Sequence, residues 1–397
     1  MRVRVLVAAL ATLALVTSAC GGGDDDAAAP EVEETTSTTL SVAEAAAAYT
    51  GPGPYPVGVT TLELEGAIPV EVWYPAVEGS TGEDTYDVRD LIPPSVSQLL
   101  TAEIPATFTT AAARDADVAD GEFPLVLFSH GYTGFRQQST FLTAHLASWG
   151  MIVAAPDHWS RDIFHTLDTF LGGTAIETND SVDDLRLTRV LMEAEQAAAG
   201  SPFEGHVATN QIAAVGHSAG GGTVLGIAPD GGIAGYVSMA SGARLGGPDA
   251  PASDEPLVLP DKPSLFLAGS LDGIVSAEET TRPSFDAATA PSRLWIIEGA
   301  GHLAFSDLCT FGNGSGIIGV AVASGLGPFL DAAPQFRSLG EDGCLEPAVS
   351  VEDTFPIVKH VVTSWLRELF GVDAVPVGLG PDVAGEYSVP VEIEENL

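Results

Sequence analysis

The sequence predicts an α/β fold with a mostly parallel central sheet and helices on both of its faces. From about residue 123 to residue 370, short apolar runs alternate with segments of helical pattern, the order typical of βαβ units. The chain also contains Gly216-His217-Ser218-Ala219-Gly220, set between the apolar run 211–215 and the small-residue helix start 221–227. A serine between two such glycines, on a sharp strand-to-helix turn, is a typical feature of this sheet architecture.

Eight apolar segments are expected to form strands: 57–64, 68–73, 123–128, 151–155, 211–215, 233–239, 264–268 and 294–297. The first two favour an antiparallel pair, and the third is the kind of apolar run found in a buried parallel strand. Residues 77–122 between them are expected to form a polar loop with room for a short helix. Helices are expected over residues 137–148, 181–199, 221–227 and 353–370.

A glycine- and proline-rich stretch, residues 306–351, interrupts this rhythm before the last helix. Cys309 and Cys344 lie near its ends. The third cysteine, Cys20, lies in an N-terminal segment that is typical of exported proteins and is described below. In an exported protein the two other cysteines suggest a disulfide, although two buried free thiols are the alternative. We therefore expect a disulfide-stapled insertion that forms a lid or a pocket wall.

The N-terminus has the pattern of a lipoprotein signal peptide over residues 1–19. Arg2 and Arg4 precede a short apolar run, and Val16-Thr17-Ser18-Ala19-Cys20 resembles a bacterial lipobox, in which Cys20 becomes lipidated. An ordinary secretory signal is the alternative, and the apolar run is too short for a membrane span. The expected location is the outer face of the cell membrane.

The rest of the chain divides by composition. Residues 20–50 are acidic and alanine-rich and are expected to form a flexible tether. Residues 51–375 are expected to form the folded domain, and residues 376–397 a C-terminal tail.

The charge balance excludes one class of partner. The 397-residue chain has 54 acidic and 15 basic residues, with a net charge of −39. Such a chain would repel the phosphates of a nucleic acid. The acidic surface could bind calcium, but no D-x-[DN]-x-[DN]-G loop occurs.

Three residues are candidates for nucleophilic catalysis. A serine hydroxyl needs a base to take its proton and an acid to orient that base. Ser218 is the predicted nucleophile, His302 the base after the strand 294–297, and Asp272 the acid after the strand 264–268. Their spacings are 272 − 218 = 54 and 302 − 272 = 30, in the Ser…Asp…His order of α/β-hydrolases. Asp157 is the second choice for the acid, and Asp272 could instead serve only to form a turn before Gly273.

The oxyanion of an acyl-transfer reaction needs two N–H donors. We expect the main-chain amides of Ala219 and Tyr132 to supply them. The Tyr132 ring, Trp159 and His217 are candidates for the wall of the substrate pocket, whereas His130 is given no catalytic role.

The chain resembles a group of α/β-hydrolases that contains platelet-activating-factor acetylhydrolases, dienelactone-hydrolase-like proteins and bacterial cutinase-type polyesterases. Phe128-Ser129-His130-Gly131 followed by Phe135-Arg136 is similar to the acetylhydrolase oxyanion loop. Gly131-Tyr132-Thr133 and the stretch 216–223 resemble the cutinase loop and elbow. The resemblance spans about residues 54–370 and departs from the group at the insertion 306–351 and at Ala219, where cutinases carry methionine.

The resemblance implies a serine esterase or lipase that hydrolyses short- to medium-chain, lipid-like or polyester substrates through an acyl-enzyme, with no metal or organic cofactor. The dienelactone hydrolases proper use a cysteine in place of Ser218. An acyltransferase with the same three residues, and a lipid-anchored binding protein without activity, are the alternatives.

Overall fold

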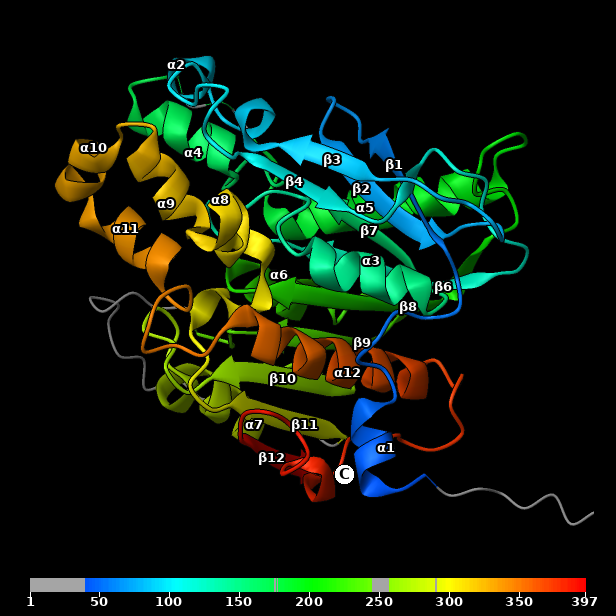
Figure 1. The fold of residues 1–397 in the computed structure, drawn as a ribbon. Helices are drawn as coiled ribbons and strands as arrows, with labels where there is room; N and C mark the ends of the chain where they lie inside the picture. Colours follow the sequence, from blue (N-terminus) through cyan, green and yellow to red (C-terminus); the bar gives the residue numbers. More distant parts are fainter. Residues whose placement is uncertain (1–39, 175, 177, 245–256, 290) are drawn as a thin grey trace, which may run out of the picture. The chain divides into compact units, whose positions relative to one another are not determined.

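A ten-stranded sheet forms the centre of the fold in the computed structural model, which describes residues 40–174, 176, 178–244, 257–289 and 291–397 (Figure 1). Its strand order is β12-β11-β10-β9-β8-β6-β7-β2-β1-β5. The strands are β1 (Val57–Glu63), β2 (Pro69–Pro75), β5 (Ala113–Arg114), β6 (Phe123–Ser129), β7 (Ile152–Pro156), β8 (Val207–His217), β9 (Ile233–Met239), β10 (Ser264–Gly269), β11 (Ser292–Ile297) and β12 (Val391–Asn396).

The mostly parallel sheet is confirmed. Strands β6 to β11 run parallel to one another, whereas β2 is antiparallel to both β1 and β7, and β12 is antiparallel to β11. All eight expected strands occur. Because the six central strands are parallel, the loops after their carboxyl ends gather at one edge of the sheet, where catalytic residues of open α/β sheets lie.

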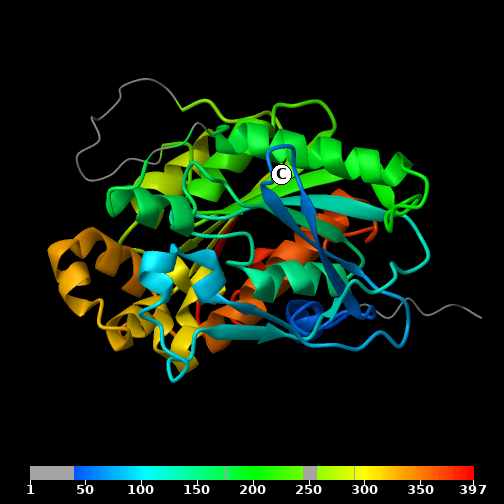
Figure 2. The ribbon, with the colours of Figure 1, turned by 90° about the horizontal axis from the view of Figure 1, so that it is seen from above.

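Helices cover both faces of the sheet, as expected (Figure 2). Helices α3 (Thr140–Ser148) and α12 (Val351–Leu369) pack on one face, while α5 (Ser181–Ala197) and α6 (Ala219–Ile227) pack on the other. Strand β6 shows why residues 123–128 are apolar: Val126 and Phe128 join the core of the first face, and Leu125 and Leu127 that of the second. Since side chains alternate along a strand, burial on both faces requires an uninterrupted apolar run.

The described end of the expected tether is folded. Helix α1 (Val42–Ala47) begins with a capping box between Ser41 and Glu44, and Ala46 is buried. The buried Tyr49 donates a hydrogen bond from its hydroxyl to Asp373 over 2.6 Å. Residues 40–50 therefore belong to the domain, and the sequence-based boundary at residue 51 lies too late in the chain. The signal peptide 1–19 and Cys20 lie outside the described residues.

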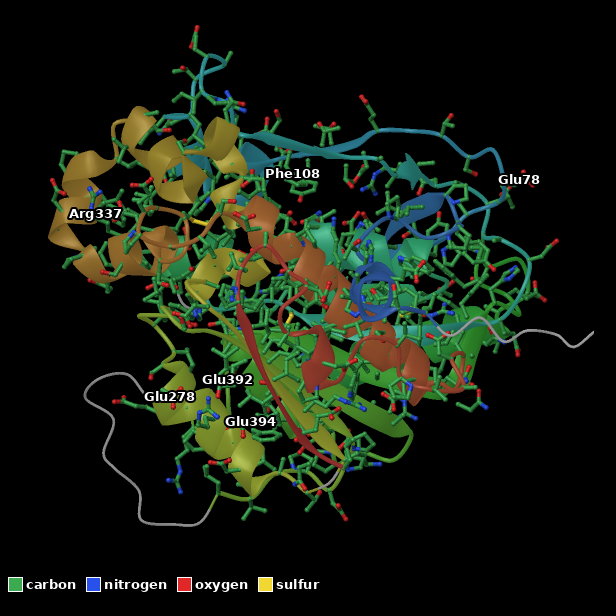
Figure 3. The ribbon with its side chains drawn as sticks, turned by 60° about the horizontal axis from the view of Figure 1, so that its bottom comes forward. Glu78, Phe108, Glu278, Arg337, Glu392 and Glu394 are labelled. Atoms are coloured by element: carbon green, nitrogen blue, oxygen red, sulfur yellow. A yellow bond between two sulfur atoms is a disulfide. The ribbon has the colours of Figure 1, made fainter. Side chains whose placement is uncertain are left out.

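The C-terminal tail is also part of the domain, contrary to expectation. It contains a short 3₁₀ helix (Pro381–Val383) and strand β12, in which Val391 and Ile393 are buried. Glu392 and Glu394 point to the other side and pair with Arg282 of helix α7 (Arg282–Ala287), close to Glu278 (Figure 3).

The insertion 306–351 folds into short helices after β11 and η3 (His302–Phe305). These are η4 (Asp307–Cys309), α8 (Phe311–Gly314), α9 (Gly316–Ala323), α10 (Gly327–Ala332) and α11 (Pro334–Glu341). The expected disulfide is confirmed: Cys309 and Cys344 are bonded, with their Cα atoms 4.9 Å apart.

The insertion packs against the segment 77–122 and helix α4 (Ile163–Phe170), as Figure 1 shows at one end of the sheet. That segment is more ordered than the expected loop. It contains β3 (Asp84–Asp87), a 3₁₀ turn (Val88–Leu91), α2 (Pro94–Ser97) and β4 (Thr107–Thr110), whose apolar side chains share a cluster with Phe311 and Val320. Within the described ranges, no helix is both long and apolar enough to cross a membrane.

Candidate active site

Ser218 stands on a strained turn between β8 and α6. Its main chain has φ 56° and ψ −124°, a conformation that is costly for a residue with a Cβ atom. The flanking glycines are required by space. A Cβ atom at Gly216 would lie 2.2 Å from the carbonyl oxygen of Gly220, and one at Gly220 would lie 2.0 Å from that of Ser129. The turn therefore projects the serine from the sheet edge, as a nucleophile elbow does.

The structure brings Ser218, His302 and Asp272 together in one hydrogen-bonded chain. The Ser218 hydroxyl lies 2.9 Å from Nε2 of His302, and Nδ1 of His302 lies 2.8 Å from Oδ2 of Asp272. The other carboxylate oxygen of Asp272 accepts hydrogen bonds from the amides of Ile274 and Val275, at 2.9 and 2.7 Å. These amides hold the carboxylate in place, and the carboxylate in turn orients the imidazole.

Asp157, the second choice for the acid, lies elsewhere. Its carboxylate accepts a hydrogen bond from the amide of Arg136 and forms an ion pair with the guanidinium of that residue at 2.7 Å. Its contacts are therefore with Arg136, whereas Asp272 is the acid that contacts His302.

The expected oxyanion donors are Ala219, the residue after the serine, and Tyr132, in the loop after β6. Ala219 is the first residue of α6, and Tyr132 lines the same cavity as Ser218. Among the described residues, neither main-chain amide has a hydrogen-bond partner. The loop also approaches the serine closely, since a Cβ atom at Gly131 would lie 3.3 Å from the Ser218 Cβ atom. An oxyanion formed at Ser218 would need two donors of this kind.

His217 is buried and, together with Gln138, connects the loop of Gly131 to His302. The amide of Gly131 donates to Oε1 of Gln138 over 3.0 Å, so Nε2 of Gln138 donates to Nδ1 of His217 over 2.8 Å. Nε2 of His217 then donates to the main-chain carbonyl of His302 over 2.9 Å. Burial lowers the pKa of His217 to about 3, which keeps the imidazole neutral, as this pattern requires. Sequence analysis did not identify Gln138.

Arg161 is a second residue that sequence analysis did not identify. Its guanidinium donates hydrogen bonds to the Ser129 hydroxyl, the His130 carbonyl and the Thr223 hydroxyl, at 2.7 to 2.8 Å. It thereby joins the end of β6 and the loop after it to helix α6, and this loop and this helix carry the expected oxyanion donors. Burial lowers the pKa of Arg161 to about 10.

A second Ser–His–Asp chain lies behind the oxyanion loop. The Ser129 hydroxyl is 2.8 Å from Nε2 of His158, whose Nδ1 is 2.9 Å from Asp184. Ser129 and His158 have no exposed surface. Because substrate cannot reach this serine, the arrangement supports the loop and does not form a second reactive centre.

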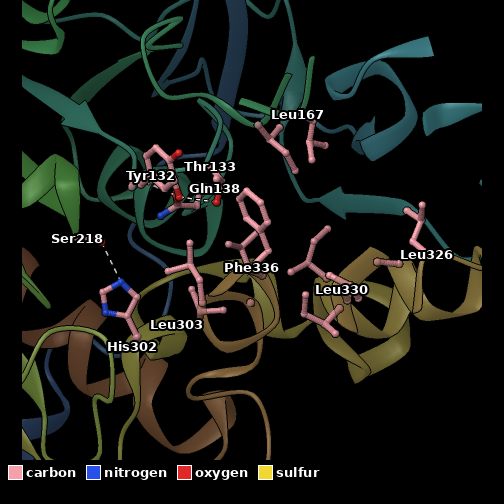
Figure 4. A pocket seen from close by; sticks show the side chains of 18 of the residues that line it. Tyr132, Thr133, Gln138, Leu167, Ser218, His302, Leu303, Leu326, Leu330 and Phe336 are labelled. Carbon is pink, nitrogen blue, oxygen red and sulfur yellow. Dashed lines mark hydrogen bonds between the residues drawn. The ribbon is translucent and has the colours of Figure 1, made fainter. Parts of the chain in front are cut away.

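An apolar cavity opens beside Ser218. Figure 4 shows the hydrogen bond between Ser218 and His302 at one end, with Leu326, Leu330 and Phe336 extending away from it. Helix α4 supplies Ile163 and Leu167 on the opposite side. The insertion also contributes to the wall with Leu308, Ile317, Ile318, Ala321, Phe329, Leu339 and Gly340.

The three candidate pocket residues are placed differently. Tyr132, half of whose surface is exposed, and His217 both line the cavity. Trp159 instead lines a neighbouring groove, where its ring lies 5.0 Å from that of His165. The reason is local: the chain turns after β7, so that Trp159 packs beside α4 and away from Ser218. Among the described residues, no group of three or more His, Cys, Asp or Glu side chains is arranged to hold a metal ion.

Comparison with known proteins identifies the fold and one family resemblance. Residues 66–199, about a third of the chain, match the family model of platelet-activating factor acetylhydrolase, isoform II. Comparison with curated protein sequences gives no match. Among solved structures, a ferulic acid esterase from Streptomyces cinnamoneus superposes with a TM-score of 0.55 at 20% identity, over 86% of this chain and 98% of that chain. The chain therefore has the α/β-hydrolase fold, and its match to the acetylhydrolase family supports a carboxylic ester hydrolase.

Proposed function

We propose that this chain is an exported, lipid-anchored serine hydrolase that cleaves carboxylic esters with an apolar acyl chain. The observation that carries the proposal is the hydrogen-bonded chain from Ser218 through His302 to Asp272 at the mouth of an apolar cavity. A binding protein would have no use for a strained serine held against a histidine, because strain of this kind costs about 1–3 kcal/mol.

The reaction uses an acyl-enzyme. His302 takes the proton of the Ser218 hydroxyl as the oxygen attacks the ester carbonyl, and Asp272 stabilises the resulting imidazolium. The amides of Ala219 and Tyr132 bind the oxyanion of the tetrahedral intermediate. His302 then protonates the departing alcohol and activates a water molecule, which releases the acid and restores Ser218. These steps require no metal or organic cofactor.

The substrate class follows from the cavity wall. Leucine, isoleucine and phenylalanine side chains bind hydrocarbon by removing its surface from water, at about 25 cal/mol for each Å². The acyl chain is therefore the group assigned to the cavity, and a medium-length or lipid-like chain fills it better than an acetyl group. The alcohol leaves on the solvent side, beside the exposed ring of Tyr132.

A chain-length series of p-nitrophenyl esters tests the proposal, with the full chain compared with Ser218→Ala. We expect turnover that rises from the acetate to medium-length esters and disappears in the variant. Product that forms only when an alcohol acceptor is added would favour acyl transfer. A folded protein that turns over no ester in either assay would contradict the proposal.

The membrane anchor is tested separately at Cys20. Metabolic labelling with an alkyne fatty acid should mark the wild-type protein in the membrane fraction of a bacterial host. Cys20→Ser should lose the label and leave the membrane. Label that persists in the variant would contradict lipidation at this residue.

A further inference from the structure

Asp342, at the end of the insertion, contacts the two loops that carry His302 and Asp272. Its Oδ1 atom accepts a hydrogen bond from the main-chain amide of His302 over 2.6 Å. Its Oδ2 atom accepts one from the amide of Gly273, the residue after Asp272, over 3.0 Å. One carboxylate therefore bridges the base loop and the acid loop.

The main chain of the insertion reinforces this bridge. The carbonyl of Asp342 accepts a hydrogen bond from the amide of Leu303 over 2.9 Å. A Cβ atom at Gly301 would lie 2.5 Å from the Cα atom of Gly343, which itself has a φ of 91°. The two segments thus touch main chain to main chain, with no space for a side chain between them.

The segment that contains Asp342 also borders the substrate cavity. Leu339 and Gly340 of α11 line the cavity two to three residues before Asp342, and the disulfide joins Cys344 to Cys309 two residues after it. A movement of α11 away from the cavity would therefore pull on the loop of His302. This coupling would not exist if the insertion were attached to the domain only at its two ends.

We propose that Asp342 is a positioning residue for catalysis, which fixes the distance between the loops of Asp272 and His302 and makes the insertion part of the catalytic framework. The inference rests on the proposed hydrolase function. Asp342 does not touch the reacting atoms. It acts through the main chain on which the base and the acid are mounted, and a displacement of about 1 Å in such groups can lower the rate by about 100-fold.

The test compares Asp342→Ala and Asp342→Asn in the full chain. Asp331→Ala is the matched control, because Asp331 lies in the same insertion with 73% of its side chain exposed. The readouts are kcat and KM on a p-nitrophenyl ester and the rate at which a fluorophosphonate labels Ser218. The second readout reports nucleophile activation without requiring an ester substrate.

We expect Asp342→Ala to lower kcat and the labelling rate by about tenfold or more, with KM within about twofold of the wild type. Asp342→Asn should fall in between, since its oxygen still accepts from one amide while its NH₂ group faces the other. Asp331→Ala should match the wild type in both readouts.

The outcomes separate this inference from the proposed function. If the wild type is labelled but hydrolyses no ester, the proposed function fails, and the relative labelling rates still decide the role of Asp342. Wild-type rates in Asp342→Ala would overturn the inference while leaving the hydrolase intact. A wild type that is not labelled overturns both. If neither variant folds, Asp342 serves the fold and not catalysis, and the inference is also overturned.

Discussion

Gln138 donates a hydrogen bond to Nδ1 of His217 over 2.8 Å, in a fully buried position next to the nucleophile turn. Because the same side chain accepts from Gly131, and His217 donates to the carbonyl of His302, these contacts link the expected oxyanion loop to the base. The two parts of the site that must act on one carbonyl group are therefore held in a fixed relation.

Replacing Gln138 with alanine should weaken both stability and catalysis. Two buried polar groups, the Gly131 amide and Nδ1 of His217, would lose their partner at a cost of about 1–3 kcal/mol each. We expect a lower free energy of unfolding in urea and a kcat reduced by about 10- to 100-fold, with a smaller change in KM.

Gln98→Ala is the control, because the Gln98 side chain is exposed and donates to the nearby carbonyl of Ser95. It should leave both measurements unchanged. If Gln138→Ala retained wild-type kcat, the link between the loop and His302 would have no role in the reaction.

A phenylalanine at Ala321 should shorten the acyl chain that the enzyme accepts. Ala321 lies on α9 and lines the cavity. We expect the larger side chain to fill the part of the cavity that α9 lines and to leave the space beside Ser218 open. We expect kcat/KM for medium-length p-nitrophenyl esters to fall by about tenfold, equivalent to about 1.4 kcal/mol, and that for the acetate to change little.

Val322→Phe, one residue further along the same helix, provides the matched control. Val322 is 47% exposed and does not line the cavity. The Val322→Phe variant should have the same preference among ester chain lengths as the wild type. Equal loss on all chain lengths in Ala321→Phe would show that the acyl chain does not enter the cavity.

The sequence predicted the elements that have a strong local signal. The apolar run 123–128 identified β6, because a strand that is buried on both faces favours apolar side chains at successive positions. The tail containing β12 was not recognised as a strand, although Val391-Glu392-Ile393-Glu394 alternates. The strand follows the irregular stretch after α12 and pairs with β11 at the edge of the sheet. This pairing joins distant parts of the chain, so no local pattern indicates it.

The parts of the candidate site were predictable to different degrees. Ser218 is marked by close glycine spacing, and His302 and Asp272 by their positions after apolar strands. Gln138 and Asp342 each join two segments through a pair of hydrogen bonds, Gln138 to Gly131 and His217 and Asp342 to His302 and Gly273. Such contacts leave no periodicity or motif, so only the folded chain reveals them.

The Asp307 carboxyl group should make the free energy of unfolding fall as the pH rises from about 4 to 7. Burial raises its pKa to about 7, while the amide of Phe141 donates to its carboxylate over 2.9 Å. In the unfolded chain the pKa is about 3.9, so between these values the native state holds more protons. The contribution of this group to the free energy of unfolding is therefore present below about pH 4 and is lost as the pH rises to about 7.

Asp307→Asn removes this titration and keeps an acceptor for the Phe141 amide. Relative to the wild type, the variant should gain stability by about 2–4 kcal/mol as the pH is raised from 4 to 7.5, as measured by urea unfolding at each pH. Asp286→Asn, at an exposed position on α7, should show no such trend. A constant difference between Asp307→Asn and the wild type would contradict the raised pKa.

The disulfide between Cys309 and Cys344 should stabilise both the fold and the activity. It closes a loop with a sequence separation of 35, for which chain entropy predicts a contribution of about 3–4 kcal/mol. Cys344 is also two residues from Asp342, whose carboxylate accepts from the amide of His302, and Cys309 is two residues from Asp307, whose amide donates to the carbonyl of Gln138. Reduction of the wild type by dithiothreitol should therefore lower both the melting temperature and kcat, and reoxidation should restore them.

The double variant Cys309→Ala/Cys344→Ala should start at the lower values and not respond to dithiothreitol. Equal inactivation of both proteins by the reagent would assign the effect to another site, whereas full activity in the double variant would show that the helices of the insertion hold Asp342 in place without the disulfide.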